Sequence, residues 1–353
     1  MKALIVGAGP TGLTAALELC RRGIIPTIID KRETTSNFSR AVGITPKSLE
    51  LLSASGVDKK LIAEGIAVKH AHIFRNQQRL IEVPLASENS YFPTLVALPQ
   101  DRTESLLIEA IEQLGGKVEY GVEFISLEQD RDKVTVQLSS GRKETYDFVI
   151  GADGVGSKVR QALDIDYQGF DLDETWSIAD VNAADWPYHK DFCLFQLDDG
   201  AMCVAVPIGD SRYRVISNTP DSLQALPIPM QVNHINRQGT FKISVRQAKS
   251  YSKGRVHLAG DAAHCHSPVG GRGMNMGIGD ACELAKRLAI GNIEQYSKVR
   301  HQEGQRIIPM TERGRKMISS KSIVRRSLFK GFLRLANRVS VIKKRIGKFV
   351  VEF

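Results

Sequence analysis

Three glycine-rich turns carry the residues of this chain that could take part in chemistry. Gly7, Gly9 and Gly12 form a Gly-x-Gly-x-x-Gly pattern, a Gly-Ala-Asp-Gly turn occupies residues 151–154, and a Gly-Asp turn occupies residues 260–261. Glycine lets a backbone approach a phosphate closely, and an aspartate at a strand end accepts hydrogen bonds from ribose hydroxyls. The three turns together predict a site for one large dinucleotide.

The elements expected around the first turn suit this purpose. Residues 2–6 form a short apolar run that is typical of a buried parallel strand, and residues 13–22 have the apolar face of a helix packed on that strand. The N-terminus of such a helix presents unpaired N–H groups to a phosphate. A second apolar strand ends at Asp30, 23 residues after Gly7, where a carboxylate can bind an adenosine ribose. These flanking elements favour dinucleotide binding over a plain glycine turn.

The motifs, in this order, resemble those of the group A FAD-dependent aromatic monooxygenases, which include the para-hydroxybenzoate hydroxylase-like and phenol hydroxylase-like enzymes. The resemblance covers residues 1–300 and continues more weakly into the tail. Its most specific part is the pattern Gly260-Asp261-x-x-His264-x-x-x-Pro268-x-x-Gly271-x-Gly273-x-Asn275. The resemblance implies FAD as cofactor and NADH or NADPH as co-substrate. It also implies hydroxylation of an aromatic or polyketide-like small molecule with O2, through a flavin C4a-hydroperoxide.

The resemblance also assigns the candidate site residues. The first glycines and Asp30 would hold the ADP half of FAD, Arg40 would approach the pyrophosphate, and Gln100 would reach the flavin side of the cofactor. Pro268 and Gly271 would lie near the flavin ring. No side chain is assigned as a catalytic acid, base or nucleophile, because the flavin carries the chemistry. The cofactor-binding set is Gly7, Gly9, Gly12, Asp30, Arg40, Gln100, Asp153, Gly260, Asp261, Pro268, Gly271, Gly273, Met274 and Asn275.

Some of these positions have a second interpretation. Asp153 could serve only to form its turn. Arg246 matches an arginine of the phenol hydroxylase-like branch, but a surface salt bridge is an equal alternative. His264 and His266 flank Cys265 and have the residue types of a metal site. They lack a fourth ligand at a convincing spacing, so no metal is predicted.

The element pattern predicts an α/β fold with a Rossmann-like FAD-binding domain, interrupted by an antiparallel-sheet substrate domain and followed by C-terminal helices. Short alternating strands separated by turn residues indicate the inserted sheet. The expected boundaries are 1–70, 98–170 and 250–300 for the FAD-binding domain, 71–97 and 171–249 for the substrate domain, and 301–353 for a basic helical tail.

Composition limits the class of protein. The chain has 353 residues, of which 42% are hydrophobic and 25% charged, as in ordinary globular proteins. No apolar run is long enough to span a bilayer, and the first strand begins where a secretory signal would lie. Five scattered cysteines without a Cys-x-x-Cys pair indicate reduced thiols. We therefore expect a cytoplasmic protein.

The net charge of +9 is concentrated in the tail. Residues 313–353 contain 13 Lys and Arg and one acid, a charge of +12, while the remainder has 35 bases and 38 acids. Apolar residues at steps of three and four predict a basic amphipathic helix, interrupted at Gly331. Residues 320–353 could dock on the body or attach peripherally to the inner face of an anionic membrane. Nucleic acid is not an expected partner.

Two alternative functions share the same FAD motifs. One is a flavoprotein reductase on the same scaffold, and the other is a membrane-associated flavin-binding protein whose tail matters more than catalysis. The Trp-x-Trp-x-x-Pro signature of flavin halogenases is absent from the sequence. This absence argues against the halogenase branch of the scaffold.

Overall fold

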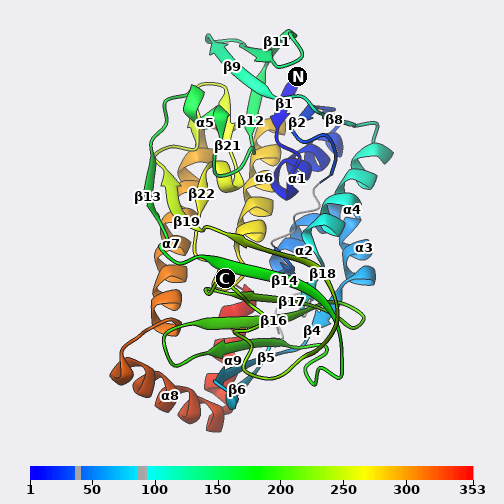
Figure 1. Cartoon of the computed structure of the whole chain (residues 1–353). Helices are drawn as coiled ribbons and strands as arrows, with labels where there is room; N and C mark the ends of the chain where they lie inside the picture. Colours follow the sequence, from blue (N-terminus) through cyan, green and yellow to red (C-terminus); the bar gives the residue numbers. More distant parts are fainter. Residues whose placement is uncertain (36–40, 86–91, 93, 353) are drawn as a thin grey trace.

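Two large β-sheets organise the molecule, one above the other in the view of Figure 1. The computed structural model describes residues 1–35, 41–85, 92 and 94–352. The upper sheet has six strands and the lower sheet seven, and helices flank the upper one. The predicted α/β fold class, with a Rossmann-like sheet, an antiparallel sheet and C-terminal helices, is confirmed. The exact domain boundaries stay a prediction.

The six-stranded sheet has the order β20-β21-β12-β1-β2-β8, and its strands run parallel except for the edge strand β20. All four residues of β1 are buried in the main apolar cluster, and helix α1 (Pro10–Cys20) packs on this strand. The bounds are β1 Ala3–Val6, β2 Thr27–Asp30, β8 Val118–Tyr120, β12 Phe148–Gly151, β20 Ser252–Lys253 and β21 Val256–Leu258.

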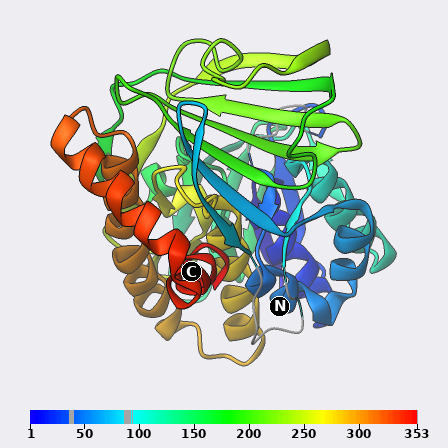
Figure 2. The ribbon, with the colours of Figure 1, turned by 90° about the horizontal axis from the view of Figure 1, so that it is seen from below.

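The seven-stranded sheet has the order β18-β14-β17-β16-β15-β5-β6, and only the β15–β5 pair is parallel. It joins the hairpin of residues 70–84 to strands much later in the chain, as Figure 2 shows from below. The bounds are β5 His70–Arg75, β6 Gln78–Pro84, β14 Trp176–Ala184, β15 Phe192–Gln196, β16 Met202–Gly209, β17 Arg212–Ser217 and β18 Gln231–Phe241.

The other strands of the described residues that pair into sheets form three smaller sheets. Their orders are β11-β10-β9, β13-β19-β22 and β3-β7-β4. The bounds are β3 Gly43–Ile44, β4 Ile66–Val68, β7 Leu95–Ala97, β9 Phe124–Gln129, β10 Val134–Leu138, β11 Lys143–Tyr146, β13 Tyr167–Asp171, β19 Ser244–Ala248 and β22 His264–Cys265. The helices are α1 Pro10–Cys20, α2 Pro46–Leu52, α3 Val57–Glu64, α4 Gln100–Gln113, α5 Lys158–Ala162, α6 Gly273–Ala289, α7 Glu294–Ile318, α8 Ile323–Arg338 and α9 Ser340–Glu352, with 3-10 turns at Ser53–Ser55 and Gly260–Ala262.

Local sequence explains where the helices near the glycine turns begin. Pro10 occupies the first turn of α1, directly after the extended Gly9. Thr45 caps α2, because its side chain accepts a hydrogen bond from the backbone N–H of Ser48. Both helices therefore start at defined residues, and the N-terminus of α1 lies at the carboxyl end of β1.

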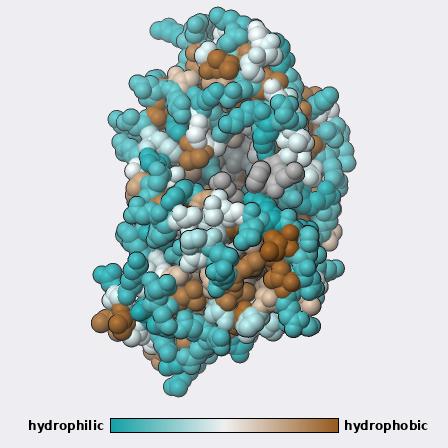
Figure 3. Space-filling model, viewed as in Figure 1, coloured by the Kyte–Doolittle hydropathy of each residue, from teal (hydrophilic) through white to brown (hydrophobic). Residues whose placement is uncertain are grey.

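The tail helices pack on the edge strand of the lower sheet. Leu333 and Ala336 of α8 are buried against Leu80, Ile81 and Val83 of the hairpin. One face of α8 is therefore docked on the body, while a hydrophobic patch over its start is visible at the lower left of Figure 3. Within the described part of the chain, no helix is long and apolar enough to cross a membrane.

The predicted interruption at Gly331 is wrong. Helix α8 continues through this glycine, and the break before α9 falls at Val339, whose φ and ψ of −115° and 103° are extended. A glycine inside a helix costs only about 1 kcal/mol. Packing of the following turn on β6 is sufficient to offset this cost.

Candidate cofactor-binding site

The first glycine turn is packed so tightly that two of its positions exclude any side chain. Gly7 has a φ of +106°, and a Cβ atom there would lie 2.4 Å from the carbonyl oxygen of Ala152 in the second turn. A Cβ atom on Gly12 would lie 1.9 Å from the carbonyl oxygen of Gly7. At Gly9, a Cβ atom would meet no atom of the described residues within 4 Å. The turn is closed toward the sheet and open at the N-terminus of α1, which is the shape that a pyrophosphate requires.

Asp30 ends β2 beside this turn and already has several donors. Its carboxylate accepts hydrogen bonds from the N–H of Ala8 at 2.7 Å and from the backbone, Nε and Nη2 of Arg32 at 2.9, 3.0 and 2.9 Å. Burial raises the pKa of Asp30, but these donors hold the pKa below its ordinary value. A carboxylate has about four acceptor sites. A ribose hydroxyl must therefore share or replace an Arg32 donor, and the ribose contact stays a prediction.

Gln100 and Glu104 of α4 connect this region to the segment before β3. The N–H of Ala41 donates to Oε1 of Gln100 at 3.2 Å, and Nε2 of Gln100 donates to Oε1 of Glu104 at 2.8 Å. The other oxygen of Glu104 lies 3.6 Å from Nη1 of Arg32. Burial raises the pKa of Glu104. The predicted contact of Gln100 with the flavin side stays untested, and Arg40 lies outside the described residues.

Asp153 holds the start of α5. Its carboxylate accepts hydrogen bonds from the hydroxyl of Ser157 at 2.5 Å and from the N–H of Val159 at 3.2 Å. Burial raises the pKa of Asp153. These contacts support the turn-forming interpretation directly. A cofactor contact would have to be additional to them, and it stays a prediction.

The third glycine turn lies against the first. A Cβ atom on Gly260, which has a φ of +61°, would lie 2.5 Å from Oγ1 of Thr11 in α1. One residue later, the side chain of Asp261 is exposed at the end of the parallel strand β21. This placement suits the predicted bond from Asp261 to a ribityl hydroxyl.

The glycine-rich loop before α6 is held by Asn275. Its Oδ1 accepts hydrogen bonds from the N–H of Thr45 at 2.9 Å and the hydroxyl of Ser48 at 2.7 Å. Its Nδ2 donates to the carbonyl oxygens of Gly43 at 2.8 Å and Gly271 at 3.0 Å. Asn275 is thus a positioning residue for this loop, and its predicted contact with the cofactor is not established.

Within the loop, backbone is accessible where the resemblance places the flavin ring. Gly271 has a φ of +59°, and a Cβ atom on it would have no neighbour within 4 Å in the part of the chain that the structure describes. Its N–H donates to the carbonyl oxygen of Pro268 at 3.0 Å. Gly273 then begins α6, and Met274 is buried. The open backbone and the helix N-terminus together form a surface that fits an anionic ring edge.

Asp280 is a buried ionic centre that the sequence analysis missed. Its Oδ2 accepts a hydrogen bond from the N–H of Gly260 at 3.0 Å and lies 2.6 Å from Nε2 of His264, while its Oδ1 accepts from Nε of Arg300 at 2.6 Å. Burial raises the pKa of Asp280, but His264 and Arg300 offset this and hold it at about 2. The ionised carboxylate joins α6, the third turn and α7.

The histidine pair has protein partners. His264 contacts Asp280, and Nδ1 of His266 donates to the carbonyl oxygen of Ser267 at 2.7 Å. Burial lowers the pKa of His266 to about 4. Among the residues that the structure describes, no group of three or more His, Cys, Asp or Glu side chains could hold a metal ion.

The match to a known family extends over most of the chain. A family model described as an FAD binding domain matches residues 1–226 and 221–308. The chain belongs to this FAD-binding family. The open backbone at Gly9 and Gly271, two helix N-termini and strand-end carboxylates fit FAD, so the FAD-binding assignment agrees with the structure.

Relatives of this FAD-binding chain are monooxygenases. It is 32% identical to pentachlorophenol 4-monooxygenase of Sphingobium chlorophenolicum, covering 81% of this chain and 58% of that protein. It is 30% identical to rifampicin monooxygenase of Streptomyces venezuelae, covering 90% of this chain and 72% of that protein. The fold is that of p-nitrophenol 4-monooxygenase from Pseudomonas putida DLL-E4, with a TM-score of 0.89, 20% identity and coverage of 98% and 96%. The resemblance to FAD-dependent aromatic monooxygenases is confirmed.

The chain matches only part of one of these relatives. It spans less than two thirds of pentachlorophenol 4-monooxygenase. The activity, substrates and partners of that longer protein are therefore carried to this chain only as a proposal.

A second buried ion pair links the lower sheet to the FAD-binding part. Nε and Nη2 of Arg214 in β17 donate to the two carboxylate oxygens of Asp180 in β14 at 2.6 and 2.7 Å, and Nη1 donates to the carbonyl oxygen of Ala41 at 3.1 Å. Arg214 is fully buried. The sequence analysis missed this pair, because Arg214 comes to lie opposite Asp180 only when β14 and β17 pair.

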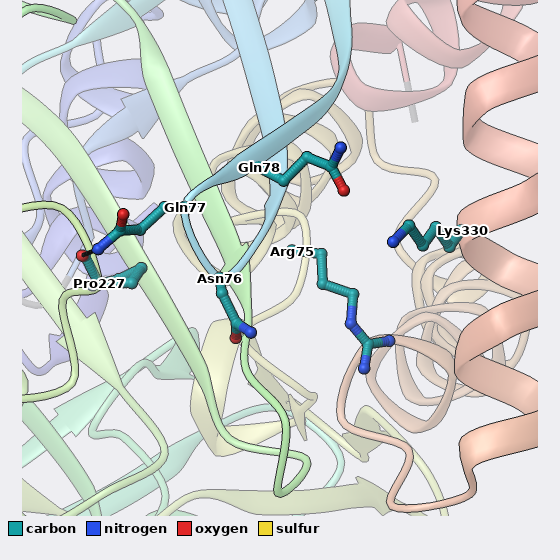
Figure 4. Close-up of a pocket in the computed structure, with 6 residues that line it drawn as sticks. All are labelled: Arg75, Asn76, Gln77, Gln78, Pro227 and Lys330. Carbon is teal, nitrogen blue, oxygen red and sulfur yellow. Dashed lines mark hydrogen bonds between the residues drawn. The ribbon is translucent and has the colours of Figure 1, made fainter.

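The pocket drawn in Figure 4 is separate from the FAD-binding residues. It has a volume of about 570 Å³ and lies between the β5–β6 turn and α8. Arg75, Gln78 and Lys330 border the space between the hairpin and the helix. No residue of the three glycine turns lines it. We therefore assign it no part in cofactor binding.

Arg246 forms a surface salt bridge, which was one of its two possible roles in the sequence analysis. Its Nη2 lies 3.1 Å from Oδ2 of Asp171, and both side chains are partly exposed. Exposed ion pairs contribute about 0–1 kcal/mol to the free energy of unfolding.

We expect Arg246→Gln to leave FAD affinity unchanged and to lower the free energy of unfolding by less than about 1 kcal/mol. Cofactor titration measures the FAD affinity, and urea denaturation measures the stability. A tenfold loss of FAD affinity would mean that Arg246 takes part in cofactor binding.

Proposed function

We propose that this protein is an FAD-dependent monooxygenase that uses NADH or NADPH and O2 to hydroxylate an aromatic or polyketide-like small molecule. The observation that carries the proposal is the meeting of the first and third glycine turns at the carboxyl ends of the parallel strands. The names of the related proteins support oxygenation over simple reduction. A reductase on this scaffold is therefore the weaker alternative.

The chain's residues would bind and orient the cofactor along one edge of the upper sheet. The backbone around Gly9 would receive the pyrophosphate, and Asp30 and Asp261 would accept hydrogen bonds from the sugar and ribityl hydroxyls. The loop at Gly271 would lie along the ring. These positions are those that the resemblance assigns, and the open backbone at Gly9 and Gly271 supports them.

The protein's part in the chemistry is orientation, electrostatic support and exclusion of water. Bound FAD supplies electron transfer from the nicotinamide to O2. The N-terminus of α6 presents positive partial charge at the end of the Gly271 loop, and this field favours a negatively charged ring edge. The seven-stranded sheet is the expected wall for the substrate, and Arg214 and Asp180 tie it to the cofactor side.

The proposal predicts a yellow protein whose nicotinamide oxidation depends on an aromatic substrate. Protein reconstituted with FAD is mixed with NADH or NADPH and a panel of phenols, and nicotinamide loss, O2 uptake and product mass are followed. A productive phenol should raise nicotinamide oxidation at least tenfold and yield a product heavier by one oxygen atom. Nicotinamide oxidation that reduces an added acceptor, without oxygen in the product, would instead identify a reductase.

A further inference from the structure

Helix α8 has two apolar faces, and the body covers only one of them. Leu333 and Ala336 pack against the hairpin strand β6. Phe329 also packs on this cluster, whereas other apolar side chains of the helix are exposed. Figure 2 shows α8 (orange-red) at the edge of the molecule. We call the exposed set the apolar stripe; it consists of Val324, Leu328, Phe332 and Leu335, with exposed fractions of 67%, 70%, 51% and 60%.

Arginines border this stripe on both sides. At 100° per residue, Arg325 falls on one side of it, and Arg334 and Arg338 fall on the other. All three of these flanking arginines are exposed, and Nη2 of Arg334 donates a hydrogen bond to Oε1 of Gln78 in the hairpin at 3.0 Å. Met317 and Ile323, at the corner between α7 and α8, extend the exposed apolar surface. An apolar centre with basic margins is the pattern of a helix that lies in the headgroup region of a bilayer.

The charge of the surrounding segment identifies the kind of partner. Residues 313–351 contain 13 Lys and Arg and no Asp or Glu. A symmetric contact with a second copy would bring the flanking arginines of one protomer against those of the other, with no acid of this segment between them. Nucleic acid would require aromatic stacking residues, whereas most of the stripe is aliphatic. An anionic lipid surface satisfies both the charge and the apolar stripe.

We propose that the exposed face of α8 binds the surface of an anionic phospholipid bilayer. The apolar stripe enters the boundary between headgroups and acyl chains, and Arg325 and Arg338 lie beside lipid phosphates. The bilayer contacts only the side of α8 that faces away from the hairpin, so docking on the body and membrane binding occur together. This inference does not depend on the proposed hydroxylation.

Flotation of the full FAD-loaded chain with vesicles tests the proposal. The protein should float with vesicles of phosphatidylcholine and phosphatidylglycerol in equal amounts, and not with phosphatidylcholine alone. High salt should weaken the binding, because it screens exposed charges. Replacing Arg325 and Arg338 by glutamine should lower the affinity by about fivefold for each arginine.

A matched pair of variants separates the stripe from net charge. Leu328→Asp with Leu335→Asp should reduce vesicle binding at least tenfold. Ile125→Asp with Ile290→Asp changes the charge equally at two apolar positions outside α8, which are 47% and 64% exposed. This control should bind vesicles as the natural protein does. Since all four positions are exposed, both variants should retain their FAD content and melting temperature.

Three results would overturn the proposal. One is absence of binding to phosphatidylglycerol vesicles at low salt, and another is equal loss of binding in both double variants. The third is an oligomer without lipid that becomes a monomer when the stripe is substituted, since it would assign the face to a second copy.

Insertion of the stripe can also be observed directly. The tryptophan fluorescence of a Phe332→Trp variant should shift to shorter wavelength when anionic vesicles are added.

Discussion

Asp280→Asn should lower the free energy of unfolding by about 3–5 kcal/mol, because it leaves the guanidinium of Arg300, whose side chain is only 15% exposed, without the counter-charge of Asp280. The wild-type carboxylate is fully buried, and it accepts bonds from both Arg300 and the backbone of Gly260. The asparagine side chain has nearly the same shape as that of aspartate, but it carries no negative charge. Urea denaturation followed by circular dichroism measures the difference.

The pH dependence of this loss has a defined sign. The pKa of Asp280 in the folded state is about 2, below its ordinary value of 3.8, so the ionised form stabilises the fold. This contribution is fully present above about pH 4 and is lost as the pH falls through about 2, on the order of 2 kcal/mol. The stability difference between the natural protein and Asp280→Asn should therefore shrink over that interval.

A double variant provides the control for this prediction. Asp280→Leu with Arg300→Met removes both charges and should be more stable than Asp280→Asn, since no unpaired charge is then buried. If Asp280→Asn unfolds at the same urea concentration as the natural protein, the buried carboxylate does not hold the third turn to α7.

The sequence alone was sufficient to predict the parts of the candidate site that consist of backbone. Where a Cβ atom would meet a carbonyl oxygen, only glycine fits, so the position can be recognised in the sequence. Gly7 and Gly12 are examples. Helix starts are similarly local, since Pro10 and Thr45 act within one turn. The fold class follows from such local patterns and from the alternation of apolar residues.

The buried charges could not be predicted in the same way. Asp280 and Arg300 lie on different helices, and their pairing depends on how α6 and α7 cross. Arg214 meets Asp180 only after β14 and β17 have paired in register. Sequence spacing does not specify contacts between elements. The break of the tail at Val339 rather than Gly331 has the same origin, since packing on β6 decides where the helix ends.

Gly12→Ala should reduce FAD affinity by about a hundredfold or more, which corresponds to about 2.8 kcal/mol. The added methyl group would lie 1.9 Å from the carbonyl oxygen of Gly7, so α1 must move away from β1 and the phosphate-binding turn must open. Such overpacking also costs about 1–3 kcal/mol in the free energy of unfolding. Titration of the FAD-free protein with FAD, followed by flavin fluorescence, measures the affinity.

Gly9→Ala separates a cofactor effect from a packing effect. A methyl group at this position has none of the described residues within 4 Å, and the backbone of Gly9 is in the extended region that alanine adopts readily. The FAD-free variant should therefore unfold within about 0.5 kcal/mol of the natural protein. Its FAD affinity should nevertheless fall at least tenfold, because the methyl group occupies the space through which the pyrophosphate reaches the backbone. Gly239→Ala, equally open but on β18, should change neither quantity. Unchanged FAD binding by Gly9→Ala would mean that the phosphates bind elsewhere than at the N-terminus of α1.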